Sequence, residues 1–402
     1  MQVNLIGLGG GAADTVTIEG RRALEQAELV LGAERLLESL PKKETQKHIA
    51  AVRPEEILAR LLSENYVNCC VLYSGDTGFY SGARGLLPLL EEAGIPCRIF
   101  PGISSVQLLA ARLQRPWQDW KLCSAHGAAC DPVAAVMEGR PVFFLTGGER
   151  TPAALCRALT DAGLGFLPVA VGERLSCPEE RVVRTTAAEC AGMQFAPLSV
   201  LLADPAPRPC VRAAGIPDDA FCRGEAPMTK QEVRAAILAK LAVAPGDTVW
   251  DVGAGTGSVS VELALAAREG RVFAVEYKEE ALALIRQNRE RFGAWNLRLV
   301  PGRAPEALDI LPAPDAVFIG GSEGALAGIV DAALGKNPDV RLCVSAIALE
   351  TLSAALDIFT TRGLAAEVTQ IAVSRAKPGG KLHLLLANNP VFLLSARREG
   401  GA

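Results

Sequence analysis

The chain has 402 residues, of which 50% are hydrophobic and 21% charged, and its formal net charge is −4. This length predicts two or three domains that each bury a core, and the composition is typical of a soluble α/β protein. The acidic balance argues against nucleic acids and anionic membranes as partners. We expect no signal peptide, because no basic segment precedes the first predicted strand, and no membrane span, because no apolar run is long enough. These expectations indicate a cytoplasmic protein.

Cysteine is frequent but has no metal-binding pattern. The chain contains 11 cysteines, ten of them before residue 223. None form a C-x-x-C motif, and no spacing is typical of a zinc or iron–sulfur site. We therefore expect reduced thiols and no bound metal.

Glycine-bearing segments follow the predicted strands in the first half of the chain. Open α/β sheets bind ligands at the carboxyl ends of their strands, so a site is expected where these segments meet. The strands and following segments are residues 2–6 with 7–14, residues 69–73 with 74–81, residues 97–100 with 101–105, residues 122–124 with 126–127, and residues 142–145 with 146–148.

The first of these segments also permits a dinucleotide-binding interpretation. Gly7, Gly9 and Ala12 match the pattern G-x-G-x-x-A. The next strand, however, ends in Gly32 rather than in the acidic residue that would bind a ribose, although Glu34 is near. A nicotinamide cofactor is therefore the weaker alternative here.

Taken together, the segments G-L-G-G-G, S-G-D-T-G-F-Y-S, P-G-I-S-S, S-A-H-G and L-T-G resemble the tetrapyrrole methylase superfamily, and within it the precorrin C5-methyltransferases. The resemblance covers residues 1–203 and implies a two-lobed α/β fold that binds S-adenosylmethionine. Asp76 alone could instead be a turn residue that caps the next helix. Gly10 and Thr77 stand where this family usually has proline, which we expect to change loop stiffness more than chemistry. The residues that the resemblance implies for donor binding are Gly7, Gly9, Gly75, Asp76, Gly78, Ser104, Ser105 and Thr146.

A proline-rich stretch separates the two halves. Four prolines within residues 205–217 exclude a regular helix or a central strand. We therefore interpret residues 204–227 as a linker. Directly after it, Thr229 and Glu232 have the spacing of a capping box, which predicts a helix at residues 230–241.

The second half contains a further glycine segment. A predicted strand at residues 248–252 includes Asp251 and leads into G-A-G-T-G-S at residues 253–258, which opens a predicted helix. The glycines allow a tight turn and the close approach of a ligand. The next strand ends in Glu276, about where an acidic residue would contact ribose hydroxyls. The G-x-G-x-G spacing resembles class I S-adenosylmethionine methyltransferases, with a nicotinamide site or a turn without a ligand as alternatives.

Further motifs narrow this resemblance. M-T-K-Q-E-V-R from Met228, G-R-A-P-E from Gly302 and F-I-G-G-S from Phe318 are similar to the precorrin C15-methyltransferases of the decarboxylating type. Glu323 departs from that family, which tends to have a small residue there. Predicted strands at residues 341–346, 366–374 and 381–388 complete a seven-stranded Rossmann-like sheet, in which Gly379-Gly380 forms the last turn. For this domain, residues 228–402, the implied donor-binding residues are Thr229, Asp251, Gly253, Gly255, Thr256, Gly257, Ser258, Glu276 and Ala304.

The fusion of both domains resembles the bifunctional precorrin C5,15-methyltransferases of cobalamin biosynthesis. The resemblance implies that the first half methylates carbon 5 of precorrin-6B, or of its cobalt form. The second half would methylate carbon 15 and decarboxylate the acetate arm of ring C. Both families tend to assemble, so a homo-oligomer is also implied.

The implied substrate is rich in carboxylates, so basic and hydroxyl groups near the donor segments are candidates for contacting it. For each basic residue a solvated surface charge is the alternative. His126 either orients a loop or relays a proton. The candidates are Lys230, Arg303 and Ser322 in the second half, and Arg84 and His126 in the first.

Two other functions remain open. One half could bind S-adenosylmethionine without transferring its methyl group, or the second half could methylate another small molecule or a nucleic acid. The acidic balance and the lack of a basic stripe or a base-flipping motif argue against a nucleic acid.

Overall fold

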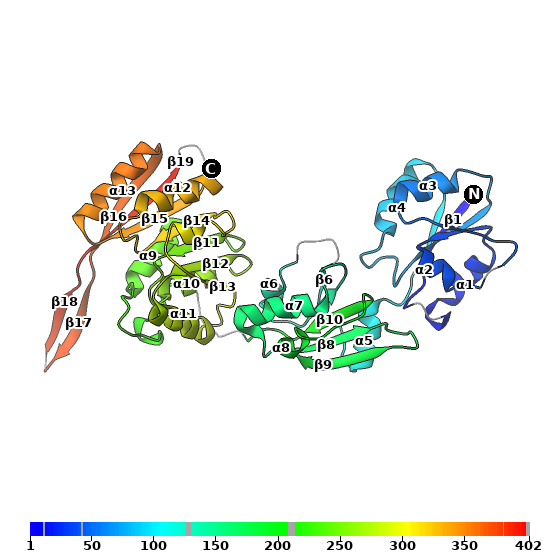
Figure 1. The fold of residues 1–402 in the computed structure, drawn as a ribbon, viewed down its shortest axis with the longest axis horizontal. Helices are drawn as coiled ribbons and strands as arrows, with labels where there is room; N and C mark the ends of the chain where they lie inside the picture. Colours follow the sequence, from blue (N-terminus) through cyan, green and yellow to red (C-terminus); the bar gives the residue numbers. More distant parts are fainter. Residues whose placement is uncertain (11–12, 42, 126–129, 208–213, 381, 399–402) are drawn as a thin grey trace. The chain divides into compact units, whose positions relative to one another are not determined.

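A computed structural model describes residues 1–10, 13–41, 43–125, 130–207, 214–380 and 382–398. The chain forms two compact α/β units, which confirms the predicted fold class (Figure 1). The first unit comprises Met1–Cys130, Arg140–Thr160 and Gly165–Pro205. The second comprises Asp131–Gly139, Asp161–Leu164 and Ala206–Ala402.

The first lobe of the first unit is a parallel sheet with the strand order β3-β2-β4-β1-β5. The three inner strands β2, β4 and β1 are largely buried, because helices cover both faces of the sheet. Leu5 of β1 packs toward α3 and α4, whereas the next residue, Ile6, packs toward α1 and α2. The elements are β1 Gln2–Gly7, α1 Ile18–Glu25, β2 Leu29–Gly32, α2 Glu34–Glu38, β3 Lys47–Ala50, α3 Pro54–Leu61, β4 Asn68–Tyr73, α4 Ala83–Glu92 and β5 Cys97–Phe100.

The second lobe is a mixed sheet with the order β6-β7-β10-β8-β9, in which only β6 and β7 are parallel. Helix α5 packs on it through Val106, Leu109 and Leu113. The predicted two-lobed architecture is therefore present. The elements are α5 Ser105–Leu113, β6 Lys121–Ser124, β7 Val142–Leu145, α7 Pro152–Leu159, β8 Pro168–Glu173, β9 Arg181–Thr186, α8 Ala187–Cys190 and β10 Ser199–Ala203.

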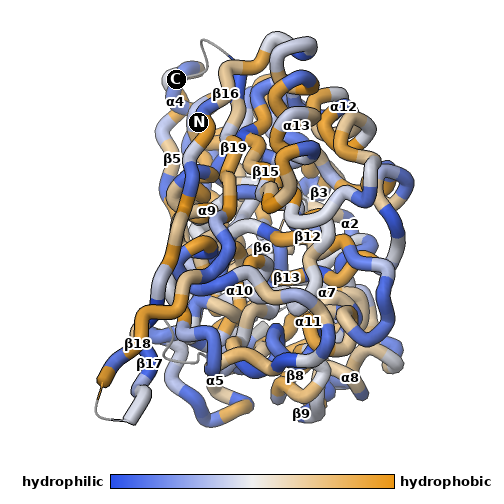
Figure 2. The backbone as a smooth tube through the Cα atoms, turned by 90° about the vertical axis from the view of Figure 1, so that its left-hand side faces the viewer, coloured by the Kyte–Doolittle hydropathy of each residue, from blue (hydrophilic) through white to orange (hydrophobic). Residues whose placement is uncertain are grey.

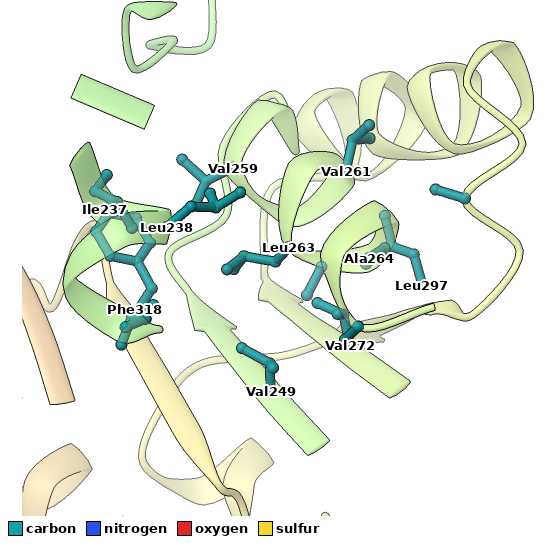
Figure 3. Close-up of a cluster of buried hydrophobic side chains, with 14 of the residues drawn as sticks. Ile237, Leu238, Val249, Val259, Val261, Leu263, Ala264, Val272, Leu297 and Phe318 are labelled. Carbon is teal, nitrogen blue, oxygen red and sulfur yellow. The ribbon is translucent and has the colours of Figure 1, made fainter. Parts of the chain in front are cut away.

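The second unit is built on a seven-stranded sheet with the order β13-β12-β11-β14-β15-β19-β16. The strands from β13 to β15 are parallel, and β19 is antiparallel to both of its neighbours. Val249, Val272 and Phe318 of this sheet pack against α9 and α10 (Figure 3). The elements are α6 Pro132–Val136, α9 Gln231–Leu241, β11 Thr248–Val252, α10 Ser258–Ala266, β12 Arg271–Glu276, α11 Glu279–Arg291, β13 Leu297–Pro301, β14 Ala316–Ile319, α12 Leu326–Lys336, β15 Arg341–Ala346, α13 Leu349–Thr361, β16 Leu364–Ile371 and β19 Val391–Arg398.

The end of this sheet differs from the prediction. Strand β16 covers most of the strand predicted at residues 366–374, but the other strand is β19 and not residues 381–388. Residues 391–394 are also apolar, and they insert between β15 and β16, where Leu393 and Leu394 are fully buried. The predicted turn at Gly379-Gly380 instead closes a separate ribbon of β17 Ser374–Gly379 and β18 Leu382–Ala387, in which His383 is exposed. Figures 1 and 2 show this ribbon projecting from the sheet of its own unit.

A buried ionic network joins the end of the predicted linker to the second unit. Arg234 is fully buried, and its guanidinium donates to Glu262 and Asp218, each at 2.8 Å. It also donates to the carbonyl of Thr229, while Glu232 pairs with Arg375 of the ribbon. The predicted capping box is therefore absent: α9 has Lys230 as its N-cap, with no side-chain cap hydrogen bond.

We expect Arg234→Ala to destabilise the second unit by about 3–5 kcal/mol, because it leaves the buried Glu262 carboxylate without its counter-ion. Arg362→Ala is the control, since it breaks an exposed pair with Asp331 and should cost at most about 1 kcal/mol. Denaturant unfolding of both variants, followed by circular dichroism, measures the difference. Equal losses would show that the buried network does not stabilise the unit.

Candidate active sites

In the first unit, the loops after β1, β4 and β5 meet backbone against backbone. A Cβ atom on Gly7 would lie 2.7 Å from the amide nitrogen of Gly102 and 2.7 Å from the carbonyl oxygen of Gly75. A Cβ on Gly102 would lie 2.2 Å from the same carbonyl oxygen. Gly9 and Gly75 also exchange backbone hydrogen bonds of 3.1 and 2.8 Å. Only glycine fits this junction, which explains the glycine-bearing strand ends.

Asp76 fixes the junction through backbone amides. Its carboxylate accepts hydrogen bonds from the amide of Gly78 at 2.8 Å and from that of Gly102 at 3.1 Å. Ser104 begins α5 with a capping box formed with Gln107. The carboxylate of Asp76 thus connects the loops after β4 and β5, which goes beyond the local turn that was the alternative interpretation of this residue.

These loops line a cavity of about 270 Å³ between the two lobes of the unit. Gly7 and Gly78 are not in its lining: Gly7 lies in the junction beneath, and Gly78 supports Asp76. Arg84 is also outside the lining, and His126 lies outside the described residues. The predicted residues that do line the cavity are Gly9, Gly75, Asp76, Ser104, Ser105 and Thr146.

Sequence reasoning missed the far wall of this cavity. Gly172 lies in β8, Leu175 follows β8, and Leu198 directly precedes β10. Neither strand has a glycine motif that could have indicated these residues. At Gly10, a Cβ would lie 2.1 Å from the Oγ of Ser176 and 2.7 Å from the carbonyl of Leu175, so this wall approaches the first loop closely. Thr77, the other departure from proline, is buried and donates to the carbonyl of Phe100 at 3.5 Å.

In the second unit, the loops after β11 and β14 also meet backbone against backbone. A Cβ on Gly253, after β11, would lie 2.5 Å from the carbonyl oxygen of Gly321, after β14. Gly253, Gly255 and Gly257 all have positive φ angles, of 73°, 55° and 72°. The predicted G-x-G-x-G turn is thus formed by left-handed residues that favour glycine.

Two carboxylates with different surroundings face this turn. Glu276 accepts hydrogen bonds from the amides of Gly255, Tyr277 and Lys278, at 2.9 to 3.0 Å. Asp251 is fully buried and accepts one hydrogen bond from Ser260, while its Oδ1 has no partner among the described residues. Burial, reinforced by the charge of Glu276, raises the pKa of Asp251 to about 7.

These groups line a cavity of about 450 Å³. Three predicted residues are not in its lining: Lys230 is exposed at the start of α9, Thr256 is buried beneath the loop, and Gly257 is the N-cap of α10. The predicted residues that line the cavity are Thr229, Asp251, Gly253, Gly255, Ser258, Glu276, Arg303, Ala304 and Ser322.

Sequence reasoning missed a side-chain cluster at this cavity. Tyr277, Arg303 and Glu323 follow β12, β13 and β14, and all three line the cavity. The guanidinium of Arg303 lies 3.7 Å from the centre of the Tyr277 ring and forms an ion pair with Glu323. The sequence indicated Arg303 as a candidate and Glu323 as a departure from the family, but not their contact with Tyr277.

Among the described residues, no group of three or more His, Cys, Asp or Glu side chains is placed to hold a metal ion in either cavity. Within the same residues, no helix is both long and apolar enough to cross a bilayer. The ten described cysteines are free, and burial raises the pKa of Cys69 to about 11 and that of Cys70 to about 12. These two thiols are therefore protonated and unsuited to nucleophilic chemistry.

Comparison with known proteins defines the class of both units. Residues 2–191 match the family model of tetrapyrrole (corrin/porphyrin) methylases, and residues 219–398 match that of the precorrin methyltransferase domain. The protein is thus a fusion of two methyltransferase domains.

One relative matches the whole fusion. The chain is 33% identical over 387 residues to a precorrin-6Y C(5,15)-methyltransferase (decarboxylating) of a Sinorhizobium species, which covers 94% of this chain and 92% of the relative. The chain belongs to this family of bifunctional precorrin methyltransferases.

Other relatives match somewhat less than half of this chain. A probable cobalt-precorrin-6B C(15)-methyltransferase (decarboxylating) of Pyrobaculum calidifontis is 46% identical over 45% of this chain and 95% of its own length. A solved structure of a precorrin-6Y C5,15-methyltransferase from Geobacter metallireducens is 38% identical over 47% of this chain and all of its own, with a TM-score of 0.45.

The raised pKa of Asp251 predicts a pH-dependent stability. Between its ordinary value of 3.8 and about 7, the folded protein holds a proton that the unfolded chain has released. The stabilisation is therefore complete below pH 3.8 and is lost as the pH rises through about 7. Within this window, we expect the wild type to lose about 1.4 kcal/mol per pH unit relative to Asp251→Asn. Denaturant unfolding of both proteins across the window measures this, and a constant difference would contradict it.

Proposed function

We propose that this protein methylates precorrin-6B, metal-free or with cobalt, at carbons 5 and 15 and removes carbon dioxide from the acetate arm of ring C. Each unit would use S-adenosylmethionine at its own cavity. The observation that carries the proposal is the match to a C(5,15)-methyltransferase along 94% of the chain, combined with two separate glycine-lined cavities at strand ends. We propose that the first domain, residues 1–203, methylates carbon 5. The second domain, residues 228–402, would methylate carbon 15, and residues 204–227 would be the linker.

The residues of the second cavity fit the chemical groups of S-adenosylmethionine. Glu276 is buried at the end of β12 and can accept hydrogen bonds from ribose hydroxyls. The Oδ1 atom of Asp251 is a buried acceptor without a partner among the described residues, and a cationic ammonium group would satisfy it. Gly253 and Gly255 let the ligand approach the backbone, because no Cβ is in the way.

The first cavity would hold the donor mainly through backbone groups. Gly9, Gly75 and Ser104 present main-chain atoms from three loops, and Asp76 and Arg35 are the charged residues in the described lining. Apolar side chains of Phe79 and the far wall add contact area and exclude water.

The reaction requires positioning more than covalent catalysis. When bound, S-adenosylmethionine supplies an electrophilic methyl group. A meso carbon of a reduced tetrapyrrole is enamine-like and can attack that methyl in line, so the protein has to orient two reactants and exclude water. Orientation of this kind contributes about 7–11 kcal/mol to lowering a barrier. Decarboxylation leaves an electron pair that the conjugated ring accepts, and hydrogen bonds to its nitrogens would stabilise that charge.

Mass spectrometry of precorrin-6B, metal-free and cobalt-bound, after incubation with the protein and excess S-adenosylmethionine tests the proposal. We expect a gain of two methyl groups and the loss of one carbon dioxide. Asp76→Ala should remove one methyl transfer by loosening the first junction, and Asp251→Ala should remove the other together with decarboxylation.

The remaining outcomes separate the alternatives. One methyl gain with loss of carbon dioxide would indicate a first unit that binds the donor without transferring its methyl group. No mass change in either substrate, with donor binding intact, would contradict the corrin assignment and require another acceptor.

We also propose that the ribbon of β17 and β18 mediates self-association. Leu382 and Leu385 of β18 are 68% and 75% exposed, and Leu384 and Leu386 are exposed as well. A row of exposed leucines on a projecting ribbon is typical of a protein interface.

Light scattering of Leu382→Ser/Leu385→Ser tests this role of the ribbon. We expect an oligomer for the wild type and a smaller species for the variant, because serine removes apolar surface from the interface. Ile347→Ser, at a residue that is 77% exposed elsewhere in the unit, serves as control and should leave the mass unchanged. A wild-type monomer, or an unchanged mass of the ribbon variant, would contradict the proposal.

A further inference from the structure

The cluster of Tyr277, Arg303 and Glu323 is formed by exposed side chains at the second cavity. The side chains of Arg303 and Glu323 are 60% and 53% exposed, and Tyr277 is 37% exposed. The loops after β12, β13 and β14 thus each contribute one residue to a contact that faces solvent. An ion pair in this setting contributes little to stability, so stabilising the fold does not explain it.

The geometry holds Arg303 in one position. Its guanidinium stacks at 3.7 Å on the ring of Tyr277, and Glu323 pairs with one of its terminal nitrogens. The hydroxyl of Tyr277 donates to the other carboxylate oxygen of Glu323 at 2.6 Å. The carboxylate is therefore bound by a guanidinium and a hydroxyl at once, as an external carboxylate would be.

Glu323 adopts a backbone conformation that disfavours it. Its φ angle is +45°, in the left-handed region that a residue with a long side chain enters at a cost. The neighbouring Gly324 also has a positive φ, of 91°, so the loop turns in a way that suits small residues. Strain of this kind at a cavity is a reason to look for a function of the side chain.

We infer that Glu323 is an internal substitute for a substrate carboxylate: it keeps Arg303 aligned on Tyr277, and a carboxylate of the macrocycle replaces it on binding. The inference rests on the proposed function, which gives the second cavity a polycarboxylate acceptor. Arg303 and Tyr277 are then positioning residues for the substrate. Glu323 thereby favours ligands with a carboxylate at this point, because a ligand without one cannot displace it from Arg303.

The test uses the full chain and two readouts. The first is the affinity for uroporphyrin, a stable octacarboxylate porphyrin, measured by fluorescence quenching. The second is the pair of kcat and KM for methylation of carbon 15. For Glu323→Gln we expect tighter porphyrin binding and a lower KM, each by about two- to fivefold, the range that an exposed ion pair is worth. The values of kcat and of the Kd for S-adenosylhomocysteine should not change.

Matched variants make the test specific. Glu306→Gln removes the same charge from the same cavity, but Glu306 forms none of the ion pairs found among the described residues, so it should have no effect. Arg303→Gln should weaken porphyrin binding and raise KM. Adding Glu323→Gln to Arg303→Gln should have a much smaller effect than in the wild type, because Arg303 is the cation that Glu323 occupies.

Several results would overturn the inference. These are unchanged or weaker porphyrin binding by Glu323→Gln, an equal gain with Glu306→Gln, or additive effects in the double variant. Porphyrin binding needs no turnover, so the two proposals can fail separately. If the wild type methylates precorrin-6B but Glu323→Gln does not change porphyrin binding, only the inference is contradicted. The expected shifts without any methylation would contradict only the proposed function.

Discussion

Both cavities depend on one steric constraint: the loops at the strand ends meet at distances that leave no room for a Cβ atom. A Cβ on Gly102 would lie 2.2 Å from the carbonyl oxygen of Gly75, and one on Gly253 would lie 2.5 Å from that of Gly321. Because these loops close on one another, their main-chain groups and the side chains beside them converge on a single cavity in each unit. A cavity of this type binds a ligand largely through backbone atoms, and it tolerates variation in the rest of the lining.

The two units build on this constraint with different electrostatics. In the first unit, the carboxylate of Asp76 accepts hydrogen bonds from the backbone amides of Gly78 and Gly102, so its oxygens already have partners within the protein. In the second, Glu276 is satisfied by backbone amides, whereas Asp251 keeps one buried oxygen without a partner among the described residues. Burial, reinforced by the charge of Glu276, raises the pKa of Asp251 to about 7, so the second cavity has a carboxylate that titrates near neutral pH.

The sequence predicted the parts of these sites that depend on local chemistry. The G-x-G-x-G turn, Glu276 at the end of β12 and the glycines that follow β1, β4 and β5 lie where the strand pattern indicated. It could not predict which side chains reach the cavities from other elements. The stacking of Arg303 on Tyr277 depends on the spacing of neighbouring strands. Lys230 does not line the cavity in this structure; it is the N-cap of α9, one residue after the predicted cap at Thr229.

The central claim is that each glycine junction creates one binding site for the methyl donor. Calorimetric titration with S-adenosylhomocysteine measures it most directly. We predict two sites per chain in the wild type, with Gly102→Ala and Gly253→Ala each losing a different one. Gly321→Ala should keep both, since its Cβ would come no closer than 4.0 Å to the Cα of Gly253. Retention of both sites in Gly102→Ala and Gly253→Ala, with the fold intact, would contradict the account.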